Sequence, residues 1–159
     1  MAVRYRWHRT ITRESVVKVI MSSVVIAATL FSGPASPAEA DKTARSLIES
    51  GVAAYQQGGP EAAIKVWIKG SALEGNPAVL TQANVLRQVQ DFYGKPVGLD
   101  IVKEYEAGPR TRIDYIALNY EKGAAYAKFQ MYQTDSGSWI VTSFIFNTEA
   151  NQVFPACLF

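Results

Sequence analysis

The spacing of the apolar residues changes once along this chain, at Gly94-Lys95-Pro96. From Asp41 to Tyr93 the apolar positions recur every three or four residues, which is the period of a helix that buries one face. Beyond Pro96 they recur every second residue, and β-branched and aromatic residues dominate, as in half-buried strands. The sequence therefore predicts an α+β domain, with three N-terminal helices on one face of a four-stranded antiparallel meander.

Glycine, proline and asparagine mark the ends of the expected helices. The first helix is predicted over 41–57, where a Gly-Gly pair follows it, and the second over 60–70, where proline opens it and glycine closes it. The third is predicted over 77–93, with Asn76 as its N-terminal cap and Gly94 at its end. Short turn-like linkers separate the four expected strands, so each neighbouring pair should form a hairpin: 98–106, 111–120, 124–132 and 139–147.

The length of the central hairpin loop decides which side chains face the helices. A three-residue loop of Glu121-Lys122-Gly123 pairs Tyr120 with Ala124. The face toward the helices then carries Ile113, Tyr115 and Ala117 opposite Met131, Phe129 and Ala127, joined by Ile140, Phe144 and Phe146. The opposite face is unusually aromatic for a solvated surface. Its apolar members are Ile116, Leu118, Tyr120, Tyr126, Tyr132, Trp139, Val141 and Ile145, and Arg112, Asp114, Lys128 and Gln130 lie among them.

The first forty residues are typical of a cleavable secretory signal peptide. Five basic residues precede an uncharged, mostly apolar run of 13 residues from Val19 to Phe31. This run is shorter than the roughly 20 residues of a membrane-spanning helix, so an uncleaved anchor is the weaker interpretation. Ala38 and Ala40 provide the small residues that signal peptidase requires, and cleavage is expected after Ala40. The sequence thus predicts a leader over 1–40, a domain over 41–150 and an apolar tail over 151–159, in a protein that is periplasmic or secreted.

Removal of the leader leaves a nearly neutral domain without histidine. Residues 41–159 hold 11 basic and 12 acidic residues, so a concentrated basic face for nucleic acid is not expected. The single histidine, His8, lies in the leader, so serine triads, Cys-His pairs and His-ligated metals each lack a required member. We expect no cofactor, no metal and no catalytic residue. Cys157 is the only cysteine, and a buried free thiol is its expected state, with an intermolecular disulfide as the alternative.

One segment carries a resemblance to a known superfamily. The helix ending Phe92-Tyr93-Gly94-Lys95-Pro96, followed by a meander that closes with Ser138-Trp139-Ile140-Val141, resembles the small exported bacterial domains of the nuclear-transport-factor-like, or ketosteroid-isomerase-like, superfamily. The resemblance covers roughly residues 44–147. It implies a curved sheet wrapped around helices, a pocket between them and frequent dimerisation through the outer sheet face. It does not imply a reaction, because that fold hosts enzymes, ligand binders and scaffolds.

Two uses of the domain follow from the predicted register. The leading hypothesis is an exported, non-catalytic binding or interaction module that holds a small apolar ligand between helices and sheet. Close packing of a helix against the small residues Ala117, Ala125 and Ala127 is the alternative reading of that space. The candidate ligand contacts are Trp67, Phe92, Tyr115, Ala127, Phe129 and Phe144. The second hypothesis is a histidine-free acid/base enzyme of isomerase type that uses Tyr115 and a carboxylate, although the register places Asp114 on the outer face beside Lys128.

The apolar residues of the outer sheet face are expected to be buried against another surface. A homodimer would bury this face, with an interface of Ile116, Leu118, Tyr126, Tyr132, Trp139 and Ile145. The apolar tail, with Val153 and Phe154, would cover the same face within one chain. An envelope protein that docks there is a third reading.

Overall fold

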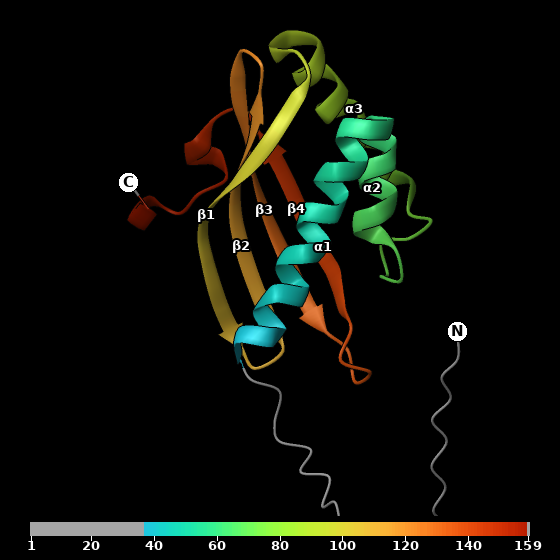
Figure 1. The fold of residues 1–159 in the computed structure, drawn as a ribbon, viewed down its shortest axis with the longest axis vertical. Helices are drawn as coiled ribbons and strands as arrows, with labels where there is room; N and C mark the ends of the chain where they lie inside the picture. The colour runs from blue at the N-terminus through green and yellow to red at the C-terminus, as the bar shows by residue number, and fades with distance from the viewer. Residues whose placement is uncertain (1–36, 159) are drawn as a thin grey trace, which may run out of the picture. The chain divides into compact units, whose positions relative to one another are not determined.

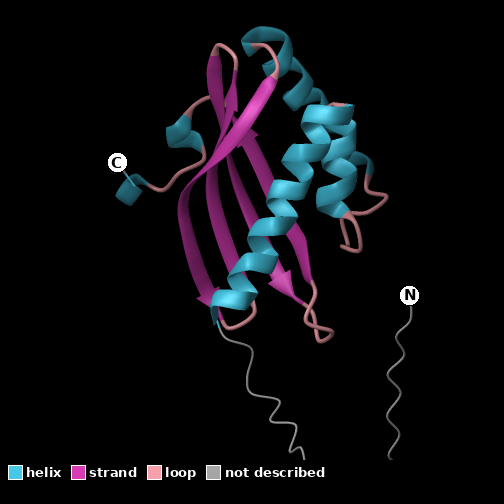
Figure 2. Ribbon diagram, in the orientation of Figure 1, coloured by secondary structure: helices cyan, strands magenta, loops and turns pink. Residues whose placement is uncertain are grey.

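The computed structural model describes residues 37–158, which form three helices, four strands and two short 3₁₀ turns (Figures 1 and 2). The predicted leader, apart from its last four residues, lies outside the described residues. The helices occupy one side of the sheet and the C-terminal tail the other, so the α+β class is confirmed. The elements are α1 Pro37–Gly58, α2 Pro60–Ile68, α3 Pro77–Tyr93, β1 Pro96–Gly108, β2 Thr111–Tyr120, β3 Gly123–Gln133, β4 Trp139–Asn147, η1 Ala150–Gln152 and η2 Ala156–Leu158.

The third helix begins and ends where its capping residues predict, whereas α2 ends at Ile68, two residues before the predicted end at 70. Asn76 caps α3 by accepting a hydrogen bond from the Ala78 amide at 2.9 Å. Gly94 ends the same helix with φ 86°, a left-handed conformation that favours glycine. The first helix starts at Pro37, four residues before the predicted Asp41, so the expected cleavage site falls within α1. Within residues 37–158, no helix combines the length and the apolar character needed to cross a membrane.

The sheet is an open antiparallel meander in the order β1-β2-β3-β4, as predicted, but the register of its central hairpin differs by one residue. Tyr120 pairs with Gly123, so the loop is the two-residue Glu121-Lys122. A one-residue slip moves every side chain to the other face of a strand. The prediction for β2 was therefore wrong: Arg112, Asp114, Ile116, Leu118 and Tyr120 face the helices and are buried, whereas Ile113, Tyr115 and Ala117 face away.

The predicted faces of β4 were also partly wrong, because this strand contains a bulge. Gln130 pairs with Ser143 while Met131 pairs with Val141, which leaves Thr142 as an extra residue. Val141 therefore points into the core, in place of the predicted Ile140. Phe144 and Phe146, on the other side of the bulge, face the core as predicted.

Trp67 on α2 lies at the centre of the core. Its ring centroid is 5.0 Å from that of Phe129 and 5.6 Å from that of Phe146, and its indole nitrogen donates to the Ile48 carbonyl oxygen at 3.1 Å. The close approach of α1 depends on Gly51, because a Cβ there would lie 1.9 Å from Trp67 Nε1. The space between helices and sheet is thus filled by aromatic side chains.

The C-terminal tail folds over the outer face of the sheet. Val153 and Phe154 are buried, and the Phe154 ring packs edge-on against Tyr115 and Tyr126, with centroids 5.8 and 5.3 Å away. The prediction that the tail docks back onto the domain is confirmed. Cys157 is exposed, so the prediction of a buried thiol was wrong: the tail leaves the sheet surface after Phe154.

Candidate functional site

A row of four charged side chains runs from the surface of α1 into the core under the sheet. Arg45 donates from Nε and Nη2 to Glu104 Oε1, at 3.1 and 2.6 Å. Arg112 forms an ion pair with the same carboxylate and donates from Nε to Asp114 Oδ1 at 2.8 Å. Arg112 and Asp114 are two residues apart on β2, so both point to the same side of the sheet, and both are buried. We call these four residues the ionic row.

The buried end of the ionic row is electrostatically unfavourable for a charged carboxylate. Burial raises the pKa of Asp114 above its ordinary value, and the hydrogen bond and charge of Arg112 oppose that rise. Among residues 37–158, none donates a hydrogen bond to Asp114 Oδ2, although this atom is buried. The predicted surface pair of Asp114 with Lys128 was therefore wrong, because the shifted register turns Asp114 inward.

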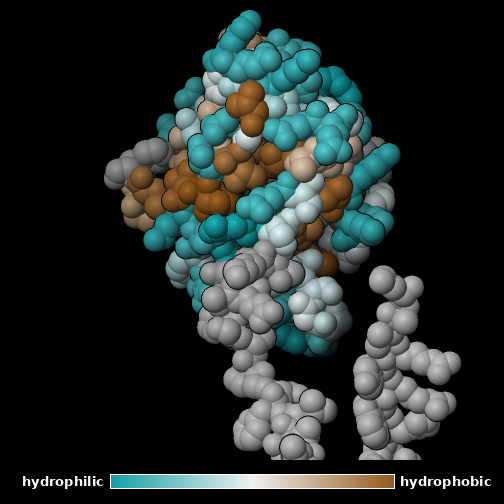
Figure 3. Space-filling view, viewed as in Figure 1, coloured by the Kyte–Doolittle hydropathy of each residue, from teal (hydrophilic) through white to brown (hydrophobic). Residues whose placement is uncertain are grey.

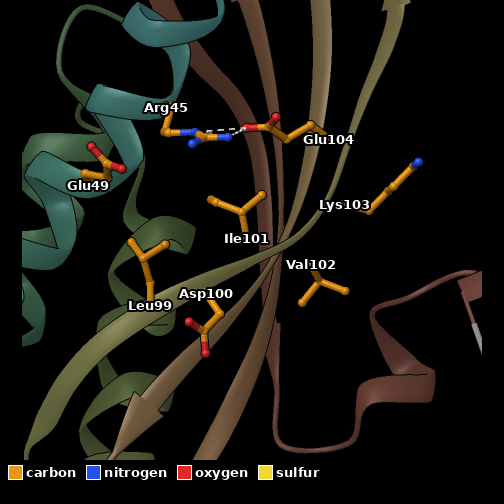
Figure 4. A pocket seen from close by; sticks show the side chains of 8 residues that line it. All are labelled: Arg45, Glu49, Leu99, Asp100, Ile101, Val102, Lys103 and Glu104. Carbon is orange, nitrogen blue, oxygen red and sulfur yellow. Dashed lines mark hydrogen bonds and ion pairs between the residues drawn. The ribbon is translucent and has the colours of Figure 1, made fainter.

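A shallow cleft of about 600 Å³ lies between α1 and β1, at the exposed end of the ionic row (Figure 4). Arg45 and Glu49, one helical turn apart, provide its helical wall. Figure 4 shows Ile101 and Glu104 on the side of α1, whereas Lys103 points away from it. The cleft lining carries both signs of charge and consists of Arg45, Glu49 and the consecutive residues 99–104.

Two buried tyrosines form a separate polar contact. Tyr55 donates to the Leu86 carbonyl oxygen at 2.8 Å, and Tyr120 donates to the Tyr55 hydroxyl at 3.3 Å. Burial raises the pKa of both phenols, so both stay neutral donors at ordinary pH. The contact joins α1, α3 and β2, and we read it as structural.

The predicted ligand contacts do not line one pocket. Trp67, Ala127, Phe129 and Phe144 pack together in the core. The other two lie elsewhere: Phe92 on α3 is 76% exposed, and Tyr115 faces the tail on the opposite side of the sheet. These six residues therefore do not lie around one common space.

Phe92 instead lines a second hollow of about 470 Å³, between α3 and the end of β4. Its aromatic ring packs edge-on against Tyr93 with centroids 4.9 Å apart. The remaining lining residues are Val85, Gln88, Val89, Phe146, Asn147 and Thr148.

The predicted interface is also divided by the register. Ile116 and Leu118 are fully buried in the core, and Trp139 packs against it, so their placement on the outer face was wrong. Tyr132 and Ile145 are each 37% exposed on the outer face, as predicted. Tyr126 also lies on that face, where Phe154 covers it.

The described residues bring together no cluster of three or more side chains suited to hold a metal ion. They also separate Tyr115 from Asp114, since neighbouring residues of a strand point to opposite faces. The residues of the ionic row were missed as a group because their assembly depends on the hairpin register. A two-residue Glu121-Lys122 loop is the sequence signal that would have placed Arg112 and Asp114 inside.

The fold and these surfaces define a small α+β domain with a filled core, a charged cleft beside one edge strand and a partly covered outer sheet face. Comparison of the chain with family models, with curated proteins and with solved structures finds no match.

Proposed function

We propose that this chain is an exported, non-catalytic interaction module that binds another polypeptide through the outer face of its sheet and the β1 edge. One observation carries the proposal. Of the six large apolar side chains exposed among the described residues, five lie on strands and one on a helix. The five are Val97, Val102, Tyr105, Tyr132 and Ile145. Figure 3 shows hydrophobic surface gathered between the C-terminal tail and α1, where β1 crosses the molecule. Exposed apolar surface of this kind marks interaction sites.

A polypeptide fits this surface better than a small apolar ligand. Trp67 and the phenylalanines around it pack together in the part of the core where the apolar ligand was expected. The exposed apolar groups instead lie along a sheet face and a strand edge, which proteins commonly use to bind other chains. The cleft beside β1 adds polar contacts of both signs at the rim of that surface.

Export and superfamily membership belong to the same proposal. The order of basic residues, an apolar run and the Ala38-Glu39-Ala40 sequence supports cleavage and export. Three helices followed by a four-stranded meander support membership of the nuclear-transport-factor-like superfamily. Members of that superfamily often use the outer sheet face for assembly, which is the surface proposed here.

One observation favours the enzyme hypothesis, and geometry opposes it. Asp114 is an inward carboxylate whose pKa burial raises, as acid/base catalysis requires. The partner named for it, Tyr115, lies on the opposite sheet face, and Asp114 itself is inaccessible to a substrate. We therefore rank the enzyme second.

Native mass spectrometry of the protein purified from its own envelope tests the proposal. We expect a second polypeptide, either another copy or a different protein, bound to the wild type. The Tyr105→Glu and Val102→Lys variants should lose it, because both side chains are exposed on β1. Glu74→Lys, on the connection between α2 and α3, is the matched control and should retain it. A wild-type protein without a companion, or a companion retained by both variants, would reject the proposal.

A further inference from the structure

We infer that the polypeptide bound at the β1 edge is a second copy of this chain, paired β1 to β1 around a two-fold axis. This inference rests on the proposed function and names its partner. Joined in this way, the two sheets would form one continuous eight-stranded sheet, with the two clefts facing each other across the join.

β1 is a long strand at the edge of the sheet. It spans 13 residues and pairs only with β2 among the described residues, so its other side presents unpaired backbone groups. Val97, Val102 and Tyr105 are 58%, 44% and 57% exposed along it. An uncovered edge of this length and apolar content is a template for pairing with another strand.

β1 has three register shifts against β2, and the central one is a bulge at Val102. Ile101 pairs with Ile116 and Lys103 pairs with Tyr115, which leaves Val102 as the extra residue. Since Ile116 faces the core and Tyr115 faces away, Lys103 points to the outer side. Asp100, which pairs with Ala117, also points to the outer side. The bulge thus places two opposite charges, three residues apart, on the same side of the strand.

Two-fold symmetry makes these charges complementary. An axis between Ile101 and Val102 places Asp100 of each copy opposite Lys103 of the other, which gives two identical cross-strand ion pairs. If the register between the two β1 strands shifts by two residues in one direction, Asp100 lies opposite Tyr105. If it shifts by two residues in the other direction, Lys103 lies opposite Gly98, and in both cases the charges are unmatched. The charge pattern therefore selects one register of a self-complementary edge.

The wall of the cleft has the same self-complementarity. Arg45 and Glu49 lie one turn apart on α1 and both line the cleft beside β1. A two-fold axis perpendicular to the sheet reverses the direction of α1, so the order Arg45-Glu49 meets the order Glu49-Arg45 of the second copy. Two separate elements thus favour the same symmetric partner.

Sedimentation of the purified exported protein, combined with a charge swap, tests the inference. The wild type should be a dimer, and Lys103→Asp should weaken it by about tenfold or more, because aspartate then faces aspartate twice. The double variant Asp100→Lys/Lys103→Asp should restore the affinity to within about threefold, because the swap recreates both pairs. Lys65→Asp, at an exposed position of α2 outside the sheet, is the matched control and should leave the dimer unchanged.

Circular dichroism confirms that each variant is folded. A monomeric wild type at about 100 µM, or a dimer that Lys103→Asp does not weaken, would overturn the inference. Failure of the swap to restore dimerisation would also overturn it. If the wild type is monomeric but carries a different polypeptide, this inference falls while the proposed function stands.

Discussion

Replacing Arg112 with methionine should destabilise the protein strongly, because it leaves a carboxylate buried without its counter-charge. Arg112 is 2% exposed and Asp114 is fully buried, so solvent screens neither charge. Methionine keeps much of the apolar volume of the arginine stem while removing the guanidinium. The Nε hydrogen bond to Asp114 at 2.8 Å and the ion pair to Glu104 are both lost.

The expected loss follows from the burial of the pair. Removing one partner of a buried ion pair lowers the free energy of unfolding by about 3–5 kcal/mol at neutral pH. Glu104 is 26% exposed and keeps Arg45, so most of the loss is assigned to Asp114. In a domain of this size the melting temperature should fall by roughly 10–20 °C.

The pH dependence of this loss has a definite sign. Burial already raises the pKa of Asp114 in the folded protein, and Arg112 opposes that rise. Without Arg112 the folded pKa rises further above the unfolded value. A raised folded pKa contributes stability that is present below the unfolded pKa and is lost as the pH rises through the folded pKa. The deficit of Arg112→Met relative to wild type should therefore be larger at pH 8 than at pH 5.

Urea unfolding of wild type and variant at these two pH values measures the effect. The double variant Arg112→Met/Asp114→Leu is the control, because replacing a whole buried pair with apolar residues is often neutral or stabilising. The double variant should regain most of the free energy of unfolding that Arg112→Met loses. Its stability relative to wild type should also differ less between pH 5 and pH 8. A single variant within about 1 kcal/mol of wild type, or a deficit that grows toward acid pH, would refute the description of Asp114 as a carboxylate that depends on Arg112.

Three further outcomes follow from other parts of the structure. Gly51→Ala should lower the free energy of unfolding by about 1–3 kcal/mol or more, because its Cβ would overlap Trp67 Nε1, and an unchanged urea midpoint would argue against this packing. Phe154→Ala should expose Tyr115 and Tyr126, cost about 1.5–3 kcal/mol and increase binding of an apolar dye, whereas Phe92→Ala, at a 76% exposed position, should change stability by less than about 0.5 kcal/mol. N-terminal sequencing of exported protein should begin at Asp41, and intact Met1 on membrane-embedded protein would contradict cleavage.

The sequence predicted the elements of this fold because local chemistry determines their ends. Asn76 and Gly94 act within one helix, and the alternation of apolar residues is visible within each strand. The faces of the central strands could not be read in the same way. They depend on whether Gly123 belongs to the loop or to β3, and that single choice moved Arg112 and Asp114 from the surface to the core.

The predicted binding surfaces also depend on the register of the central hairpin. Leu118 was assigned to a dimer interface, but it is fully buried, so a lysine there would disrupt the core and report nothing about assembly. The sequence around Val102 and Thr142 does not predict a bulge at either position. Each bulge nevertheless determines which of the neighbouring side chains faces outward. The tail was easier to predict, because an apolar run such as Val153-Phe154 needs a surface to cover.

Hydrogen–deuterium exchange tests the central claim, that the outer sheet face and the β1 edge bind a polypeptide, most directly. The protein would be compared as the intact assembly purified from its envelope and as the separated chain. We expect amides of β1 to exchange more slowly in the assembly, while α2 and α3 exchange equally in both. Protection confined to the helices, with β1 exchanging equally in both states, would contradict the account.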